Sequence, residues 1–99
     1  MSIYLFTVTD TFVIRNRGIV LAPGFLATAH EQPFRIQIGD PIELHRPDGS
    51  QLVSRIQGIE LINAPINVIL DPQRRLPILL PADLTEQDVP PGTEVWLRK

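Results

Sequence analysis

The sequence predicts a single all-β domain spanning residues 1–99. No window places apolar residues at the helical spacing i, i+3, i+4, i+7. Ten prolines and six glycines instead divide the chain into short runs rich in Ile, Val, Leu and Phe, which is typical of strands. Ninety-nine residues, 43% of them apolar, are enough to bury one hydrophobic core but not two. These observations together indicate a small β-barrel or β-sandwich.

Eight segments have the composition of strands and are separated by turn residues. They are Ile3–Thr9, Thr11–Arg15, Gly18–Ala22, Ile42–Arg46, Gln51–Ile62, Asn67–Leu70, Leu76–Leu80 and Glu94–Arg98. Pro77 and Pro81 bracket the apolar part of the seventh strand, and proline donates no hydrogen bond to a sheet. We therefore expect Leu76–Leu80 at a sheet edge or beside a bulge, and an exposed edge invites pairing with another chain.

Local turn chemistry is clearest between the fourth and fifth of these strands. Pro47 presets φ, Asp48 can accept a hydrogen bond from the backbone that follows, and Gly49 tolerates positive φ, so Pro47–Ser50 predicts a hairpin turn. In the preceding strand the alternation directs His45 to the side opposite Leu44, towards solvent. Further along, Asp83 and Glu86 have the spacing of a capping box, which predicts one helical turn over Leu84–Asp88.

Composition and charge exclude several classes of function. The chain has no cysteine, so disulfides, thiolate catalysis and zinc-thiolate sites are excluded. The N-terminal run has no basic region and becomes polar by Thr9-Asp10, so we expect no membrane segment and a cytoplasmic location. A net charge of −2 argues against a strongly electrostatic nucleic-acid binder. His30 and His45 lack the spacing of metal ligands, and we expect neither a metal nor a cofactor.

Four segments in order carry a family pattern. Asp10–Val20 is similar to D-x-F-x-I-x-x-R-G-x-V, Ile36–Leu44 to I-x-V-G-D-x-V-E-L, Ser54–Leu61 to V-T-G-I-E-M, and Leu84–Val95 to an acidic turn followed by D-V-x-x-G. In these segments the chain resembles the second domain of translational GTPases such as elongation factor Tu. The resemblance implies a small closed antiparallel β-barrel of six to seven strands, of the translation-protein type. It also makes Arg17-Gly18, Gly39-Asp40, Gly58 and Pro91-Gly92 structural corners.

The resemblance does not imply an enzyme. No G-x-x-x-x-G-K-[ST] phosphate-binding loop is present, so the chain is not expected to hydrolyse GTP. In the family, the second domain helps to hold aminoacyl-tRNA or docks on the ribosome, which implies a protein or an RNA-containing partner here. The sequence departs from the family pattern in Leu21–Phe25, in the longer Phe25–Phe34 loop and in Leu70–Arg75. Family contacts are therefore not transferred to those segments.

The candidate site residues are charged side chains in the first hairpin and in two of these departures. They are Arg15 and Arg17 in the first hairpin, Arg74 and Arg75 in the replaced segment, and His30 and Glu31 in the long loop. Arginines that meet in the fold can bind phosphate or carboxylate groups, whereas separate arginines would pair with nearby acids. Tyr4 and Trp96 lie in the terminal strands, away from these arginines, and are expected in the core.

Three functions remain open. The first is a non-catalytic binding module with a protein or ribonucleoprotein partner. The second is a small ligand-binding or hydrolytic barrel that uses His30 and Glu31 of the 25–34 loop. The third is a structural protein that self-associates through an edge such as Leu76–Leu80.

Overall fold

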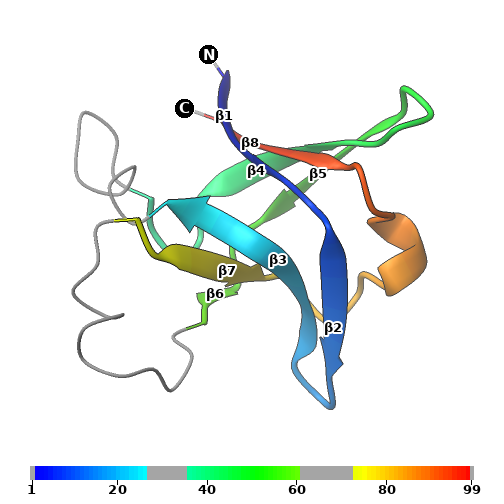
Figure 1. Cartoon of the computed structure of the whole chain (residues 1–99). Coiled ribbons are helices and arrows are strands. Elements are labelled where there is room, and N and C mark those ends of the chain that lie inside the picture. The colour runs from blue at the N-terminus through cyan, green and yellow to red at the C-terminus, as the bar shows by residue number, and fades with distance from the viewer. Residues whose placement is uncertain (1, 27–35, 61–72, 99) are drawn as a thin grey trace.

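The chain folds into two four-stranded antiparallel sheets that enclose one core (Figure 1). The computed structural model describes residues 2–26, 36–60 and 73–98. Sheet A has the strand order β1-β8-β4-β5, and sheet B has the order β2-β3-β7-β6. The strands are β1 (Ser2–Thr7), β2 (Asp10–Ile14), β3 (Gly18–Leu26), β4 (Pro41–His45), β5 (Gln51–Arg55), β6 (Gly58–Ile59), β7 (Arg75–Leu79) and β8 (Glu94–Arg98). Within the described ranges the all-β class is confirmed, no helix is long and apolar enough to cross a bilayer, and neither sheet closes into a barrel.

Two short connections, each at a corner, carry the chain from sheet A to sheet B. At the first, Val8 N–H donates to Thr93 O at 2.8 Å and Thr9 N–H donates to Ala22 O at 2.9 Å. At the second, Gln57 N–H donates to Leu79 O at 2.9 Å, so the expected strand Gln51–Ile62 is in fact two strands in different sheets. Backbone N–H groups at these corners thus donate hydrogen bonds to residues in or next to the strands of the sheets, as buried polar groups require.

The core lies between the inner faces of the two sheets. Its fully buried members come from both sheets and from the connections, among them Leu21, Phe25, Ile36, Ile42, Leu44, Ile56, Ile78, Leu80, Val89, Val95 and Leu97. The alternation in β8 shows how the sequence sets the faces: Val95 and Leu97 are buried, whereas Glu94, Trp96 and Arg98 lie on the other side of sheet A.

Strand β7 is not an edge. It lies between β3 and β6, so the expectation that Leu76–Leu80 forms an edge is wrong. The alternative, a bulge, is confirmed: Leu21 pairs with Ile78 and Phe25 pairs with Leu76, which leaves three residues of β3 opposite Pro77 alone. The irregularity in β3 compensates for the N–H that proline lacks.

The hairpin turn and the helical turn form where the sequence predicts them, but the helical turn is capped two residues later than expected. Asp48 Oδ1 accepts a hydrogen bond from Ser50 N–H at 2.9 Å and Gly49 has a φ of +90°, so the Pro47–Ser50 hairpin turn is confirmed. The expected helical turn is a short 3-10 helix, η2 (Glu86–Asp88). Its capping residues are Thr85 and Asp88 rather than Asp83 and Glu86, because the Asp88 carboxylate accepts from Thr85 N–H at 2.8 Å.

Candidate functional site

The four candidate arginines do not form one patch. Arg15 and Arg17 lie in the β2–β3 turn, at the start of β3, whereas Arg75 pairs with Leu26 at the other end of that strand. A nine-residue strand is about 25 Å long, so the two pairs are separated by roughly that distance. A single phosphate-binding cluster made of Arg15, Arg17, Arg74 and Arg75 is therefore absent. Whether either pair contacts a partner stays a prediction.

Arg17 and Arg75 are each held by a neighbouring group. Arg17 Nη2 lies 2.8 Å from Glu60 Oε1. Arg75 Nη1 donates to Gly24 O at 3.1 Å and so belongs to the β3–β7 irregularity. Arg15 is exposed and makes no ion pair with a described residue. His30, Glu31 and the rest of the 25–34 loop beyond Leu26 lie outside the described residues, as does the expected strand Asn67–Leu70.

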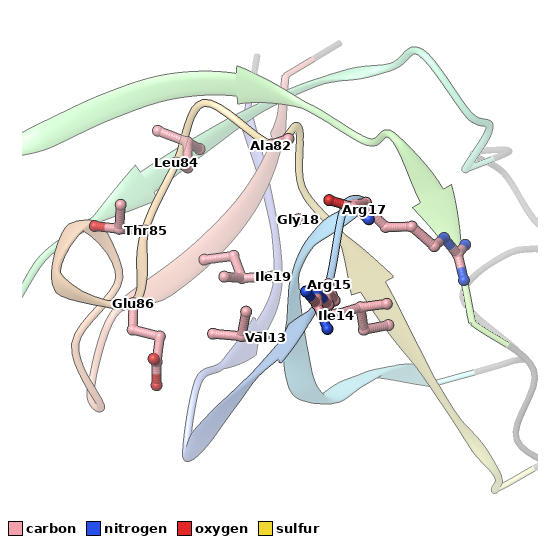
Figure 2. A pocket seen from close by; sticks show the side chains of 11 residues that line it. Val13, Ile14, Arg15, Arg17, Gly18, Ile19, Ala82, Leu84, Thr85 and Glu86 are labelled. Carbon is pink, nitrogen blue, oxygen red and sulfur yellow. The ribbon is translucent and has the colours of Figure 1, made fainter.

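A hollow of about 440 Å³ lies between the β2–β3 hairpin and the segment before η2 (Figure 2). Val13 and Ile19 point from the hairpin towards the segment that carries Thr85 and Glu86, while Arg17 points away from it. The lining is mostly apolar, and Val13 is 62% exposed. We name this space, lined chiefly by Val13, Ile19, Leu84 and Glu86, the hairpin groove.

The outer face of sheet A carries an aromatic cluster. Tyr4 and Trp96 are cross-strand neighbours with ring centroids 5.4 Å apart at an angle of 70°, and His45 stacks on Trp96 at 5.3 Å and 19°. The expectation that Tyr4 and Trp96 are core residues is wrong, since Tyr4 is 48% exposed and Trp96 is half-buried on the solvent side. His45 lies on the outer face as expected, but it is half-buried against Trp96.

Hydrogen bonds fix each of these rings. Trp96 Nε1 donates to Glu94 Oε1 at 3.1 Å, and Tyr4 Oη shares a hydrogen bond with Thr7. His45 Nε2 donates to Glu43 Oε1 at 3.0 Å. The cluster continues across the sheet, because Trp96 pairs with Glu43 and Glu43 pairs with the 53% exposed Val53. We name this surface, formed by Tyr4, His45, Val53, Trp96 and Arg98, the aromatic face.

Glu43 is the charged centre of the aromatic face. Its carboxylate accepts from His45 and from Ser2 Oγ at 2.9 Å, and Arg98 Nε lies 3.4 Å from Oε2. The His45 hydrogen bond, then the Ser2 hydrogen bond and the Arg98 charge, hold the pKa of Glu43 below its ordinary value of 4.5.

The lowered pKa of Glu43 predicts how stability responds to acid. Because the folded-state pKa lies below the unfolded one, the ionised Glu43 stabilises the fold above about pH 4.5, and this contribution is lost as pH falls through the folded-state pKa. Glu43→Gln should therefore lower the free energy of unfolding at pH 7, and its difference from wild type should shrink below pH 4.5. Urea unfolding at pH 7 and at about pH 3 measures this difference. An equal difference at both pH values would contradict the prediction.

The comparisons with known proteins assign no role to these surfaces. A scan against family models and searches of curated proteins and of solved structures found no match to the chain. The described residues also contain no group of three or more side chains that could hold a metal ion. The aromatic face is the feature that sequence reasoning missed. Its signal was the alternation in Glu94–Arg98, which directs Trp96 away from Val95 and Leu97.

Proposed function

We propose that this protein is a non-catalytic binding module with the fold of the second domain of translational GTPases, and that it docks a protein partner on the aromatic face. The single observation that carries the proposal is the set of Tyr4, Trp96 and Arg98 on one outer sheet face, with the polar atoms of the two aromatic rings held by neighbouring side chains. Tyrosine, tryptophan and arginine are the residue types that dominate binding energy in protein interfaces. Side chains that are already ordered lose little conformational freedom when a partner binds.

The geometry favours a protein over single-stranded RNA as the partner. His45 stacks on one face of Trp96, and the Tyr4 ring contacts Trp96 at an angle of 70°, so less of the indole surface is open to an incoming base. Arg55 and Arg98 on this side of the sheet are matched by Glu43 and Glu94. A charge-balanced, partly apolar surface is typical of protein interfaces.

The resemblance supports the module assignment independently. The four family segments occur in order. Three of the four glycines expected at corners, Gly18, Gly39 and Gly92, have φ values of +134°, +95° and +93°, whereas Gly58 lies in β6 without a positive φ. The proposal also includes three expectations from the sequence. The chain has the translation-protein fold, it is cytoplasmic, and it catalyses no reaction. If the partner is a ribonucleoprotein, we expect the aromatic face to bind its protein component.

The test compares capture from an extract of the source cell by three forms of the protein. Val53→Lys places a charge in the aromatic face at a 53% exposed position, whereas Ile38→Lys changes a 66% exposed residue outside both sheets. We expect Val53→Lys to reduce partner recovery about tenfold or more, and Ile38→Lys to leave it unchanged. Equal recovery by wild type and Val53→Lys would overturn the proposal.

The fluorescence of the protein provides a direct readout of the same site. The chain contains one tryptophan, Trp96, so its emission reports the aromatic face alone. Adding the captured partner should change Trp96 emission in wild type and in Ile38→Lys. RNase treatment of the capture separates an RNA-dependent partner from a protein one.

A further inference from the structure

Strand β2 is an edge strand of sheet B, and the 3-10 helix η2 lies near it, across the hairpin groove. Its one strand neighbour within the described residues is β3. Proteins protect such edges with bulges, short strands or charges. Here β1 has a register irregularity between Tyr4 and Phe6, and β6 is two residues long. By contrast, β2 is a regular strand with the apolar centre Phe12–Ile14.

Both sides of β2 expose apolar surface. Phe12 and Val13 are 57% and 62% exposed, and as consecutive strand residues they point to opposite faces of the sheet. On the inner side Val13 lines the hairpin groove (Figure 2). On the outer side Phe12 and Ile14 line a second hollow of about 250 Å³. An added strand would place side chains beside both hollows, because its own residues alternate between the two faces.

We propose that β2 pairs antiparallel with β2 of a second copy of this chain, about a two-fold axis through Val13. Two-fold pairing places Val13 opposite Val13 of the second copy, and Phe12 opposite Ile14, so like apolar surfaces meet on each face. Thr, Phe, Val and Ile are also the residues that favour an added strand. The four-stranded sheets B of the two copies then form one continuous sheet.

Charge complementarity supports pairing with a second copy of the chain. β2 begins with Asp10 and is followed by Arg15, and neither side chain makes an ion pair with a described residue. Antiparallel pairing brings Asp10 beside the β2–β3 turn of the second copy, between its Arg15 and Arg17. Parallel pairing would instead bring the two Asp10 carboxylates together. The contact spans one short strand, so it is smaller than a standard interface, and we expect a dissociation constant of about 10–100 µM.

Analytical ultracentrifugation from about 1 µM to 500 µM tests the dimer, because this range spans the expected dissociation constant. Wild type should shift from 11.1 kDa towards twice that mass as concentration rises. Val13→Lys, at an exposed position, should stay monomeric throughout. Ile38→Lys, which adds the same charge at a 66% exposed position outside both sheets, should dimerise like wild type and so controls for the added lysine.

A charge exchange tests the antiparallel register. Asp10→Arg alone should weaken the dimer about tenfold, and adding Arg15→Asp to the same chain should restore part of the lost affinity, because each dimer then regains the two pairs between positions 10 and 15 in reverse while Arg17 is unchanged. Asp10 and Arg15 form no ion pair with the described residues of their own chain, so both variants should fold normally. Circular dichroism checks this. A wild type that stays at 11.1 kDa, or a double variant no tighter than Asp10→Arg, would overturn the proposal.

Discussion

Replacing Gly24 with alanine should lower the melting temperature by about 15–30 °C, which corresponds to a loss of about 4 kcal/mol. Gly24 lies in the irregular part of β3 opposite Pro77, with a φ of +95°. A Cβ atom at this position would lie 2.2 Å from Leu76 O and 2.5 Å from Pro77 N. Both contacts are with backbone in the middle of sheet B, so relieving them requires β3 and β7 to separate.

Gly39 provides a matched control, because it has the same φ of +95° but no atom within 4 Å of the alanine Cβ position. Gly39→Ala therefore carries only the cost of positive φ, about 1–2 kcal/mol. Thermal unfolding followed by circular dichroism compares the two variants. If Gly24→Ala were no less stable than Gly39→Ala, the close approach of β3 to β7 would be wrong.

Local chemistry made the turns and most strands predictable. The Pro47–Ser50 turn depends on Asp48 and Gly49 alone, and the structure has the hydrogen bond that this sequence predicts. The helical turn was predicted two residues too early at its cap. Both Asp83/Glu86 and Thr85/Asp88 have the required spacing, and only the backbone path selects the second pair.

Properties that depend on which strands are neighbours could not be read from the sequence. Proline lacks an N–H whether it lies at an edge or opposite a bulge, so Pro77 alone could not place β7 between β3 and β6. The closed barrel was likewise inferred from a resemblance, whereas the described strands form two open sheets. Sheet closure is set by pairing between distant segments, which strand composition does not encode.

The prediction of the candidate site failed for the same reason. Arg17 and Arg75 are close to the two ends of β3, and their separation follows from a nine-residue strand that was predicted to stop at Ala22. Trp96 was misplaced for another reason: its distance from the arginines suggested a core residue, whereas its position between Val95 and Leu97 places it on the outer face. On a two-sided sheet the alternation decides which face a side chain occupies, even for tryptophan.

Trp96→Ala should destabilise the fold by about 2–3 kcal/mol, less than a fully buried tryptophan because the ring is half-buried. Trp96 lies on β8, between β1 and β4, and its ring contacts Tyr4 on one side and His45 on the other. Removing the indole takes away the ring that both Tyr4 and His45 contact, and it leaves Glu94 without its indole donor. Trp96→Phe should retain about half of the lost stability, because a ring remains but its N–H does not.

A double-mutant cycle with His45 separates stacking from burial. If the His45–Trp96 stack contributes to stability, the loss in His45→Ala/Trp96→Ala should be about 0.5–1.5 kcal/mol smaller than the sum of the single losses. Urea unfolding at pH 7 measures all four proteins. Strict additivity would mean that the two rings merely lie side by side. The aromatic face would then be ordered by the hydrogen bonds of Glu43 and Glu94, and its availability to a partner would depend on those two carboxylates.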